Sequence, residues 1–475
     1  MASMSEQMDE KQKKHLKMTT APVKKLVIEL STPTVISMLV TAIYNIVDTF
    51  FVGQIGTNAT AGVGLILPVM MVIQAFGFFL GQGSGNFISR MLGAKKDEEA
   101  ETMASNGTIL ALIFGALVMA FGLILQGPLL VALGAKEGAV AAQTIAYAGD
   151  YYRIILIGAP FMCVSYVLNN QLRYQGNAFF SMIALVSGAV INCALDPLFI
   201  FAFHQEVLGA ALATVISQTI SCIFLFVGTF RSDSLRINIK KFRPTWYYIK
   251  NIFVGGAPSL FRQGLQSVAM IILNTAAGAA APAGNSDAAI AALSIVGKIM
   301  MFAFSALLGF GQGFQPICGF NYGAKKYDRV REAFRFCLVV SFAALFVLSV
   351  AGYIFAEPLV RLFRDDAVVV EYGRTAMRYQ CFTFPMMAVV VMTNMLYQNL
   401  GKVIPATVLA VARQGLMFIP AVLLLPLLFA EPLTGIFLSQ PAADLLSIIL
   451  AAPLAIYEYR LLGKMEREML KSTAK

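Results

Sequence analysis

The chain has 475 residues, which for a soluble protein would suggest about three domains. Its composition excludes that, because 58% of the residues are hydrophobic, only 13% are charged and the mean hydropathy is +0.72, as in a polytopic membrane protein. The formal charge of +10 would suit nucleic acid, but the basic residues lie between apolar segments, so we expect no nucleic-acid partner.

Twelve apolar segments are long enough to cross about 30 Å of hydrocarbon as α-helices. They are residues 26–53, 61–88, 105–133, 143–168, 181–203, 208–230, 248–280, 287–316, 332–357, 372–398, 404–429 and 433–458. The expected fold is therefore an all-α polytopic membrane protein with twelve transmembrane helices.

The remaining segments divide the chain and orient it. Residues 1–25 contain lysines but no apolar core, so they are predicted to be a tail and not a cleavable signal peptide. Residues 231–247 are a charged linker between an N-lobe, 26–230, and a C-lobe, 248–458, and residues 459–475 form a second tail. Most of the 36 Lys and Arg residues lie in the two tails or in the loops that follow the even-numbered spans, so both termini are predicted to be cytoplasmic.

The two lobes repeat each other in sequence. The motifs Gly81-Gln-Gly83 and Gly93-Ala-Lys-Lys96 recur with the same spacing as Gly311-Gln-Gly313 and Gly323-Ala-Lys-Lys326, and Pro33, Pro160, Asn169 and Gly176 match Pro258, Pro385, Asn394 and Gly401. Six spans per lobe is an even number, so both lobes insert the same way and form two pseudo-symmetric six-helix bundles. A central cavity between such bundles, opened alternately to either side, is typical of secondary transporters.

Polar residues in the first lobe predict a cation-coupling site. Asp48 lies inside the first span, where a carboxylate costs roughly 3 kcal/mol, and Tyr44 and Asn45 lie one turn before it. Asn192 and Asp196 share a face of the fifth span, and Thr214 belongs to a polar stripe on the sixth. Such a cluster can hold a proton or Na⁺. The alternatives are that Asp48 is an interfacial acid and that Asp196 only caps a break at Pro197.

The second lobe has deep cations instead. Its spans carry one deep acid, Asp444, and three deep cations, Arg262, Lys298 and Arg413. Asp444 is expected to form a structural ion pair with Arg413, and Lys298 is the other possible partner. The substrate cavity is predicted to include these three cations and the amides of Gln266, Asn394 and Gln398.

Several enzyme-like patterns have simpler explanations. The glycines before Gly93 suggest a nucleotide-binding loop, but no Gly-Lys-[Ser/Thr] follows and no strand precedes them, so close helix packing explains them better. The six cysteines lie singly in apolar segments, and His15 and His204 are the only histidines, so no metal cluster or catalytic pair is expected.

Taken together, four motifs resemble the multidrug and toxic compound extrusion (MATE) family over roughly residues 25–460. They are Tyr44-Asn-Ile-Val-Asp-Thr-Phe-Phe-Val-Gly53, the repeated Gly-Ala-Lys-Lys, Asn192-Cys-Ala-Leu-Asp-Pro197 and Arg413-Gln414. Asn321-Tyr-Gly-Ala-Lys325 is similar to the bacterial branch that includes the MepA-type exporters.

The resemblance implies a transporter that exports small amphipathic, often cationic compounds across a bacterial inner membrane. The protein is expected to need no organic cofactor and to be a monomer in the lipid bilayer. It implies H⁺ or Na⁺ coupling at Asp48 and Asp196, with Asn192, Thr214 and Tyr44 beside them. Some family members carry acidic cation ligands in spans 7 and 10, and this sequence has none there, so a Na⁺ site in the second lobe is not expected. H⁺ at the first-lobe cluster is favoured as the coupling ion, and Na⁺ bound at Asp48, Asn192 and Asp196 of the same cluster is the alternative.

Three other functions stay open at this point. A major-facilitator transporter also repeats a loop motif, but one rich in Asp-Arg and Gly-Arg-Arg. An exporter or flippase of a lipid-linked or anionic amphipathic metabolite would suit the second-lobe cations. A membrane enzyme would need a nucleophile and base that the sequence does not offer.

Overall fold

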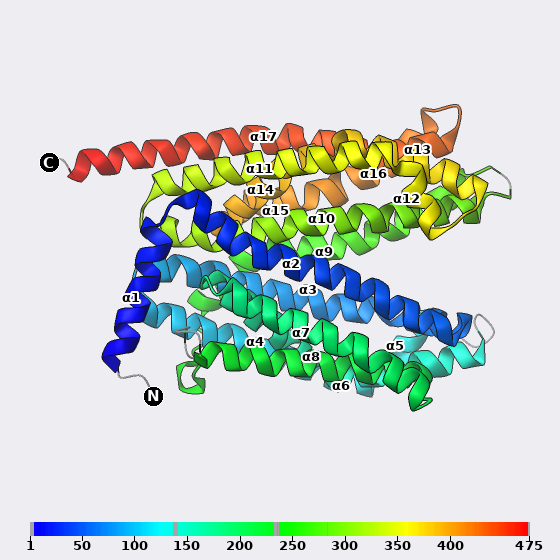
Figure 1. Cartoon of the computed structure of the whole chain (residues 1–475), viewed down its shortest axis with the longest axis horizontal. Helices are drawn as coiled ribbons and strands as arrows, with labels where there is room; N and C mark the ends of the chain where they lie inside the picture. The colour runs from blue at the N-terminus through cyan, green and yellow to red at the C-terminus, as the bar shows by residue number, and fades with distance from the viewer. Residues whose placement is uncertain (1–3, 136–140, 232–234, 236, 283, 474–475) are drawn as a thin grey trace.

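Long helices run side by side in the computed structural model, which describes residues 4–135, 141–231, 235, 237–282 and 284–473 (Figure 1). Eleven of its helical segments are long and apolar enough to span a membrane. The twelfth span is α9 (Trp246–Ala280), which is 35 residues long but carries the polar side chains of Gln263, Gln266 and Asn274. The predicted all-helical, twelve-span architecture is confirmed.

The N-lobe consists of the first six spans, and its apolar core is centred on α3 and α6. Its elements are α2 (Val23–Ile55), α3 (Thr57–Gly93), α4 (Asp97–Ile124), α5 (Gln126–Ala132), α6 (Ala142–Tyr174), α7 (Ala178–Pro197), the π-helix η1 (Leu198–Ala202) and α8 (Glu206–Arg231). Ile66 and Ile73 of α3 and Tyr152 and Ile155 of α6 are all buried in this core.

The C-lobe repeats this plan after the short η2 (Ile239–Lys241), but two of its spans are broken. Its further elements are α10 (Ser286–Gly323), α11 (Tyr327–Ile354), α12 (Ala356–Phe363), α13 (Ala367–Thr383), η3 (Phe384–Met386), α14 (Met387–Asn399), α15 (Val403–Val411), η4 (Ala412–Leu416), α16 (Phe418–Leu424), η5 (Leu425–Leu427) and α17 (Pro432–Thr473). The break at η3 contains Pro385, which lacks the N–H that a continuous helix would need.

The sequence repeat is also a repeat of hydrogen bonds. In the N-lobe, Asn169 Nδ2 donates to the carbonyl oxygen of Ser181, at 3.4 Å. In the C-lobe, Asn394 Nδ2 donates to the carbonyl oxygen of Ala406, at 2.6 Å. Asn394 and Ala406 follow Asn169 and Ser181, respectively, by 225 residues. The same hydrogen bond therefore joins the fourth and fifth spans of each lobe.

The two predicted tails belong to the folded body. Residues 1–25 contain α1 (Met4–Thr20), which lies across the ends of the other helices (Figure 1). The helix of the last span, α17, continues beyond residue 458 to Thr473. Met4, Gly93, Gly323 and Thr473 mark one end of the molecule, which we call the terminal end. The opposite end, where α2 finishes at Ile55, is the open end.

The lobes meet closely toward the terminal end. A Cβ added at Gly83 of α3 would lie 2.2 Å from the carbonyl oxygen of Ile252 in α9, and one at Gly313 of α10 would lie 2.3 Å from Ser31 Oγ in α2. Polar side chains reinforce the contact. The Arg173 guanidinium donates to Gln312 Oε1 across the lobes, although Arg173 is almost fully buried.

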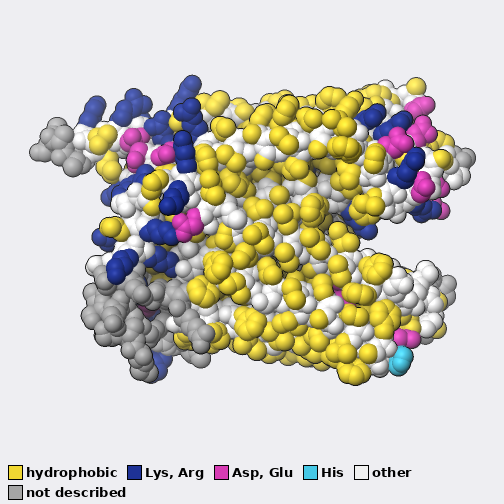
Figure 2. Space-filling view, in the orientation of Figure 1, with side chains coloured by type: hydrophobic (Ala, Val, Ile, Leu, Met, Phe, Trp, Pro, Cys, Tyr) yellow, Lys and Arg dark blue, Asp and Glu magenta, His cyan; other side chains and the backbone are white. Residues whose placement is uncertain are grey.

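Toward the open end, a cleft separates the lobes (Figure 2). Its deep end is closed by a buried chain of polar groups, in which Gln398 Nε2 donates to Ser259 Oγ at 3.1 Å and Ser259 in turn donates to Gln82 Oε1. The molecule is therefore closed at the terminal end and open at the other.

Candidate functional site

The first carboxylate of the site is on α2. Asp48 is half-buried, and its Oδ1 atom is buried without a hydrogen-bond partner. Tyr44 lies one helical turn earlier, on the side of α2 that faces Asp196 and the α6 residues Tyr151 and Tyr166, with which it interacts electrostatically. Asp48 therefore faces the interior of the N-lobe and not lipid.

The second carboxylate is at the end of α7. Asp196 has no exposed surface, and Asn192 Nδ2 donates to its Oδ1 atom at 3.4 Å, as the spacing of one helical turn predicts. Pro197 follows and cannot donate to the preceding turn, and the chain continues as the π-helix η1. Short π-helical segments are frequent at functional sites because they change the direction of side chains.

The two carboxylates and their neighbours share an excess of hydrogen-bond acceptors. Asp48 and Asp196 are close enough to interact electrostatically. Four buried oxygen atoms here have no hydrogen-bond partner, namely Asp48 Oδ1, Asn192 Oδ1, Asp196 Oδ2 and Thr214 Oγ1. Buried oxygens are normally paired, and unpaired carboxylates are costly in a low-dielectric interior. An arrangement with so many free oxygens can bind a proton or a small cation.

Tyr151 and Tyr166 of α6 were missed by sequence reasoning. Tyr151 adjoins Thr214 and interacts electrostatically with both carboxylates, and Tyr166 does so with Tyr44. The sequence carried no signal for them, since a tyrosine in an apolar span usually packs in the core or lies at the membrane interface.

Asn45, by contrast, is not among the buried residues of this group. Its side chain is exposed, and its Nδ2 atom donates to the carbonyl oxygen of Thr41, one turn earlier on the same helix, at 2.9 Å. The donor of Asn45 is thus satisfied by the backbone of its own helix, and the role of Asn45 in cation coupling stays a prediction.

The deep acid of the C-lobe is in the opposite situation. Arg413 Nε donates to Asp444 Oδ1 at 3.0 Å, and Gln440 Nε2 donates to the same oxygen at 2.9 Å. Thr383 Oγ1 donates to the other oxygen, Oδ2, at 3.3 Å. The predicted pair of Arg413 with Asp444 is present, and Lys298 is not the partner. Asp444 is fully satisfied, whereas the N-lobe acids are not.

Two cations of the C-lobe remain near the cleft. Lys298 is exposed on α10. It lies eleven residues, about three helical turns, before Gly309, which contacts Val35 of the N-lobe, so Lys298 is on the side of α10 that faces the N-lobe. Arg262 is half-buried on α9, one turn from Ser259, and Gln266 is exposed one turn further on. Within the part of the chain that the structure describes, neither Lys298 nor Arg262 has a carboxylate within 4.0 Å.

Asn394 and Gln398, which are predicted to belong to the substrate cavity, are both buried. Asn394 is buried against α15 through its bond to Ala406, and Gln398 is buried in the polar chain with Ser259. Gln315 Nε2 also donates to Gln398 Oε1, at 3.4 Å. Both amides therefore join neighbouring helices by hydrogen bonds. A sequence pattern does not show these partners, because they lie on other helices.

Comparison with known sequences agrees with the repeat. A model of the MatE family matches the chain twice, at residues 33–198 and 258–424, once in each lobe. The multidrug export protein MepA of Staphylococcus haemolyticus (strain JCSC1435) is 29% identical over 430 residues, which are 90% of this chain and 92% of that protein. MepA of Staphylococcus aureus (strain MRSA252) is 28% identical over 443 residues, 93% of this chain and 95% of that one.

A solved structure shares the fold over nearly the whole chain. The outward-facing conformation of a multidrug resistance MATE family transporter of the MOP superfamily superposes with a TM-score of 0.88 and 26% identity, covering 94% of this chain and 98% of that one. The family model covers more than half of the present sequence, with one match in each lobe. The chain therefore belongs to the MatE family.

Proposed function

We propose that this protein is a secondary active exporter of small amphipathic compounds that exchanges them for protons bound at Asp48 and Asp196. The observation that carries the proposal is the group of four buried oxygen atoms without hydrogen-bond partners around these two carboxylates. The multidrug export function named for both MepA relatives supports the transport role.

The proton is favoured as the coupling ion by the chemistry of the cluster. Two carboxylates close together in a buried site cannot both remain charged without a large cost, and one proton relieves both the repulsion and the missing donor. Na⁺ held by Asp48, Asn192 and Asp196 is the alternative. Among the described residues of the C-lobe, the deep acid Asp444 is already bound by Arg413, which does not favour a second coupling site there.

The mechanism is alternating access of the two lobes. The polar chain through Gln82, Ser259 and Gln398 closes the terminal end, while the cleft is open at the other end (Figure 2). Protonation of the cluster removes charge from the N-lobe, which changes the relative stability of the two states and links ion entry to substrate release.

The basic terminal end is proposed to face the cytoplasm of a bacterial cell. Lys and Arg side chains gather at this end in Figure 2, in agreement with the positive-inside rule. The open cleft then faces outward, with both termini inside and the chain acting as a monomer in the inner membrane.

A second candidate is an exporter of anionic amphipathic or lipid-linked compounds. It is favoured by Lys298 and Arg262, which have no carboxylate partner in the described part of the chain and lie toward the cleft. A single anionic group held by both cations would satisfy them.

Transport into liposomes tests the proposal and separates the ions. Purified protein is reconstituted, and uptake of a lipophilic cationic dye is measured under a proton gradient and, separately, under a sodium gradient. We expect proton-driven exchange that is lost in Asp48→Asn and Asp196→Asn. Asp150→Asn is the matched control, since Asp150 is an exposed acid of the same lobe.

Each outcome has a definite meaning. Full proton-driven exchange by Asp48→Asn would overturn the proposed coupling site. Exchange driven only by sodium would replace the proton with Na⁺ at the same residues. Absence of dye transport together with uptake of an anionic amphipath would favour the second candidate.

A further inference from the structure

The N-terminal helix α1 is attached to the C-lobe by its last turn. Asn321 Nδ2 donates to Met18 O at 3.1 Å and Lys326 Nζ donates to Thr19 O at 2.8 Å. The last carbonyls of a helix have no partner within the helix, and here side chains of α10 and of the turn after it supply the donors. We call these two contacts the anchor. The family match begins only at residue 33, so α1 lies outside it.

The anchor is also buried in apolar surroundings. Met18 is 3% exposed and belongs to the same hydrophobic cluster as Phe314 and Phe334 of the C-lobe. The first turns of α2 continue this packing, since Leu26 and Leu30 are buried in that cluster too. Burial of apolar side chains stabilises the attachment, so the anchor is the firm end of α1.

The middle of α1 contacts the N-lobe instead. His15 Nε2 lies 3.1 Å from the carbonyl oxygen of Gly93, the last residue of α3. Lys11 Nζ lies 3.3 Å from Glu101 Oε1 on α4. We call these two contacts the latch. The anchor and the latch together place one short helix across the boundary between the lobes, at the end that is closed.

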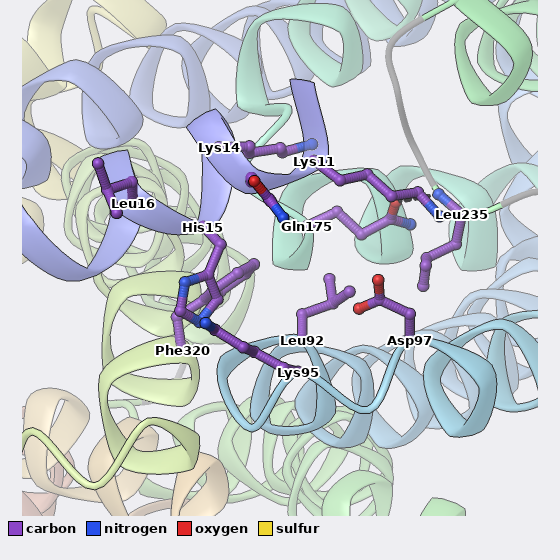
Figure 3. A pocket seen from close by; sticks show the side chains of 11 residues that line it. Lys11, Lys14, His15, Leu16, Leu92, Lys95, Asp97, Gln175, Leu235 and Phe320 are labelled. Atoms are coloured by element: carbon purple, nitrogen blue, oxygen red, sulfur yellow. Dashed lines mark hydrogen bonds between the residues drawn. The ribbon is translucent and has the colours of Figure 1, made fainter. Parts of the chain in front are cut away.

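Space remains beneath the latch. A cavity of about 410 Å³ lies beneath α1, and Lys11, Lys14 and His15 line it from that helix (Figure 3). Leu92 of α3 and Phe320 of α10 line it from the two lobes. Because side chains do not fill this space, polar contacts and not packing hold the latch.

The latch is more exposed than the anchor. The side chains of Lys11 and Glu101 are 36% and 18% exposed, whereas Thr19 of the anchor is 2% exposed. An ion pair that water reaches contributes little to stability because water screens it. His15 adds one hydrogen bond to a backbone carbonyl, which is a modest contribution. The latch is therefore the part of α1 that releases first.

The latch is attached at the point where the lobes touch. A Cβ added at Gly93 would lie 2.1 Å from the carbonyl oxygen of Phe320, so α3 and α10 are in direct contact there. Phe320 is next in the chain to Asn321 of the anchor. A movement that separates Gly93 from Phe320 therefore carries the N-lobe partners of the latch away from the anchor. Alternating access of the lobes requires such a movement at the terminal end.

We propose that α1 is a strap that holds the terminal end closed, anchored on the C-lobe and latched to the N-lobe only while the lobes are in contact there. The latch contacts stabilise the closed state and not the state in which this end is open, so they shift the equilibrium toward closure. This role rests on the alternating access in the proposed function, but not on the identity of the coupling ion or the substrate.

Distances between spin labels on the purified full-length protein in liposomes test this role. One pair, at exposed positions 96 and 325, reports the separation of the lobes at the terminal end, and a second pair, at exposed positions 12 on α1 and 98 on α4, reports the latch. In Lys11→Gln/His15→Ala, which lacks the latch, the population with a long 96–325 separation should rise at least about threefold, as expected for the loss of one modest hydrogen bond.

The same helix supplies a matched control variant. Lys17 is exposed and pairs with Glu29 of α2, so its contact stays within the segment formed by α1 and α2. Lys17→Gln removes a charge of the same sign from α1 and should leave both distance distributions at their wild-type values. An equal response of the control and the latch variant would assign the effect to the charge of α1 and would overturn the strap.

The coupling must also act in reverse, because it is reciprocal. Gly83→Ala forces a methyl group against the carbonyl oxygen of Ile252 in the other lobe and so favours separation of the lobes at this end. The 12–98 distance should lengthen together with the 96–325 distance in this variant. A 12–98 distance that stays short while the 96–325 distance is long, or a latch variant with unchanged lobe separation, would overturn the proposal.

Both readouts are distances and not transport rates. A protein that shows no proton-driven exchange would still give the expected distances if α1 is a strap, so a failure of the proposed coupling at Asp48 and a failure of the strap are distinguishable.

Discussion

Gly323 of α10 packs directly on the carbonyl oxygen of Arg90 in α3, so that a Cβ at Gly323 would lie 2.0 Å from that oxygen. The same contact occurs with the lobes exchanged, since a Cβ at Gly93 would lie 2.1 Å from the carbonyl oxygen of Phe320. Phe320 follows Arg90, and Gly323 follows Gly93, by the same 230 residues. The two lobes thus form a self-complementary contact around their pseudo-two-fold axis.

Enlarging either glycine should open the terminal end. Gly323→Ala forces its methyl group against a backbone oxygen that cannot rotate away, and we expect a cost of about 1–3 kcal/mol to the closed state. Spin labels at the exposed positions 96 and 325, one in each lobe, should then report a larger population with a long separation.

The control for this change lies on the same helix. A Cβ at Gly297 of α10 would have no atom within 4 Å. Gly297→Ala should leave the spin-label distances unchanged and raise stability slightly, because alanine favours the helix. Unchanged distances in Gly323→Ala would show that the glycine contact does not determine closure.

Breaking the ion pair of Arg413 and Asp444 should destabilise the C-lobe strongly. The pair is largely buried, with side-chain exposures of 17% and 3%, and removal of one partner leaves a charge without compensation. We expect Asp444→Asn to cost about 3–5 kcal/mol, measured as a fall in the thermal unfolding temperature.

Two comparisons identify the buried charge as the cause. The double variant Arg413→Gln/Asp444→Asn should recover part of the loss, because it leaves no unpaired charge. Glu468→Gln, which breaks the exposed pair with Lys464, should cost less than about 1 kcal/mol. A double variant no more stable than Asp444→Asn would argue against this account.

Thr214→Val distinguishes the two coupling ions. The substitution conserves shape but removes one of the four oxygens without a partner. A proton binds to a carboxylate and needs no ring of oxygen ligands, so proton-driven exchange should remain within about threefold of wild type. Loss of exchange comparable to that in Asp48→Asn, measured in the same liposomes, would instead indicate that Thr214 is a ligand of Na⁺.

Arg329→Gln should release the N-terminal helix. The Arg329 guanidinium donates to Ala21 O at 2.6 Å and to Asn321 Oδ1 at 2.9 Å, and so fixes the joint between α1 and α2. We expect faster amide hydrogen exchange in α1 but not in α2, whose amides are protected within a membrane span. Arg335→Gln, at an exposed position on the same helix α11, is the control, and equal exchange in both variants would contradict this role.

Much of the fold could be predicted because lipid imposes simple rules on a sequence. Each span must be apolar and helical over about 30 Å, and the duplicated Gly-Gln-Gly and Gly-Ala-Lys-Lys motifs made the two lobes visible without any structure. Asp48, Asn192 and Asp196 were recognisable for the same reason, since a carboxylate is costly in lipid and helical spacing places Asn192 beside Asp196.

The tertiary structure decided which polar groups are satisfied and which are free. The sequence grouped Asn45, Asn394 and Gln398 with functional residues, but backbone carbonyls and neighbouring amides occupy all three. It also gave no sign that α1 caps both lobes, since most contacts of α1 are to residues far away in the chain. A sequence shows where a costly polar group lies along a helix, whereas only the packed helices determine whether a partner lies within hydrogen-bonding distance. By that criterion Asp444 is a paired acid, whereas Asp48 and Asp196 each keep a buried oxygen atom without a hydrogen-bond partner.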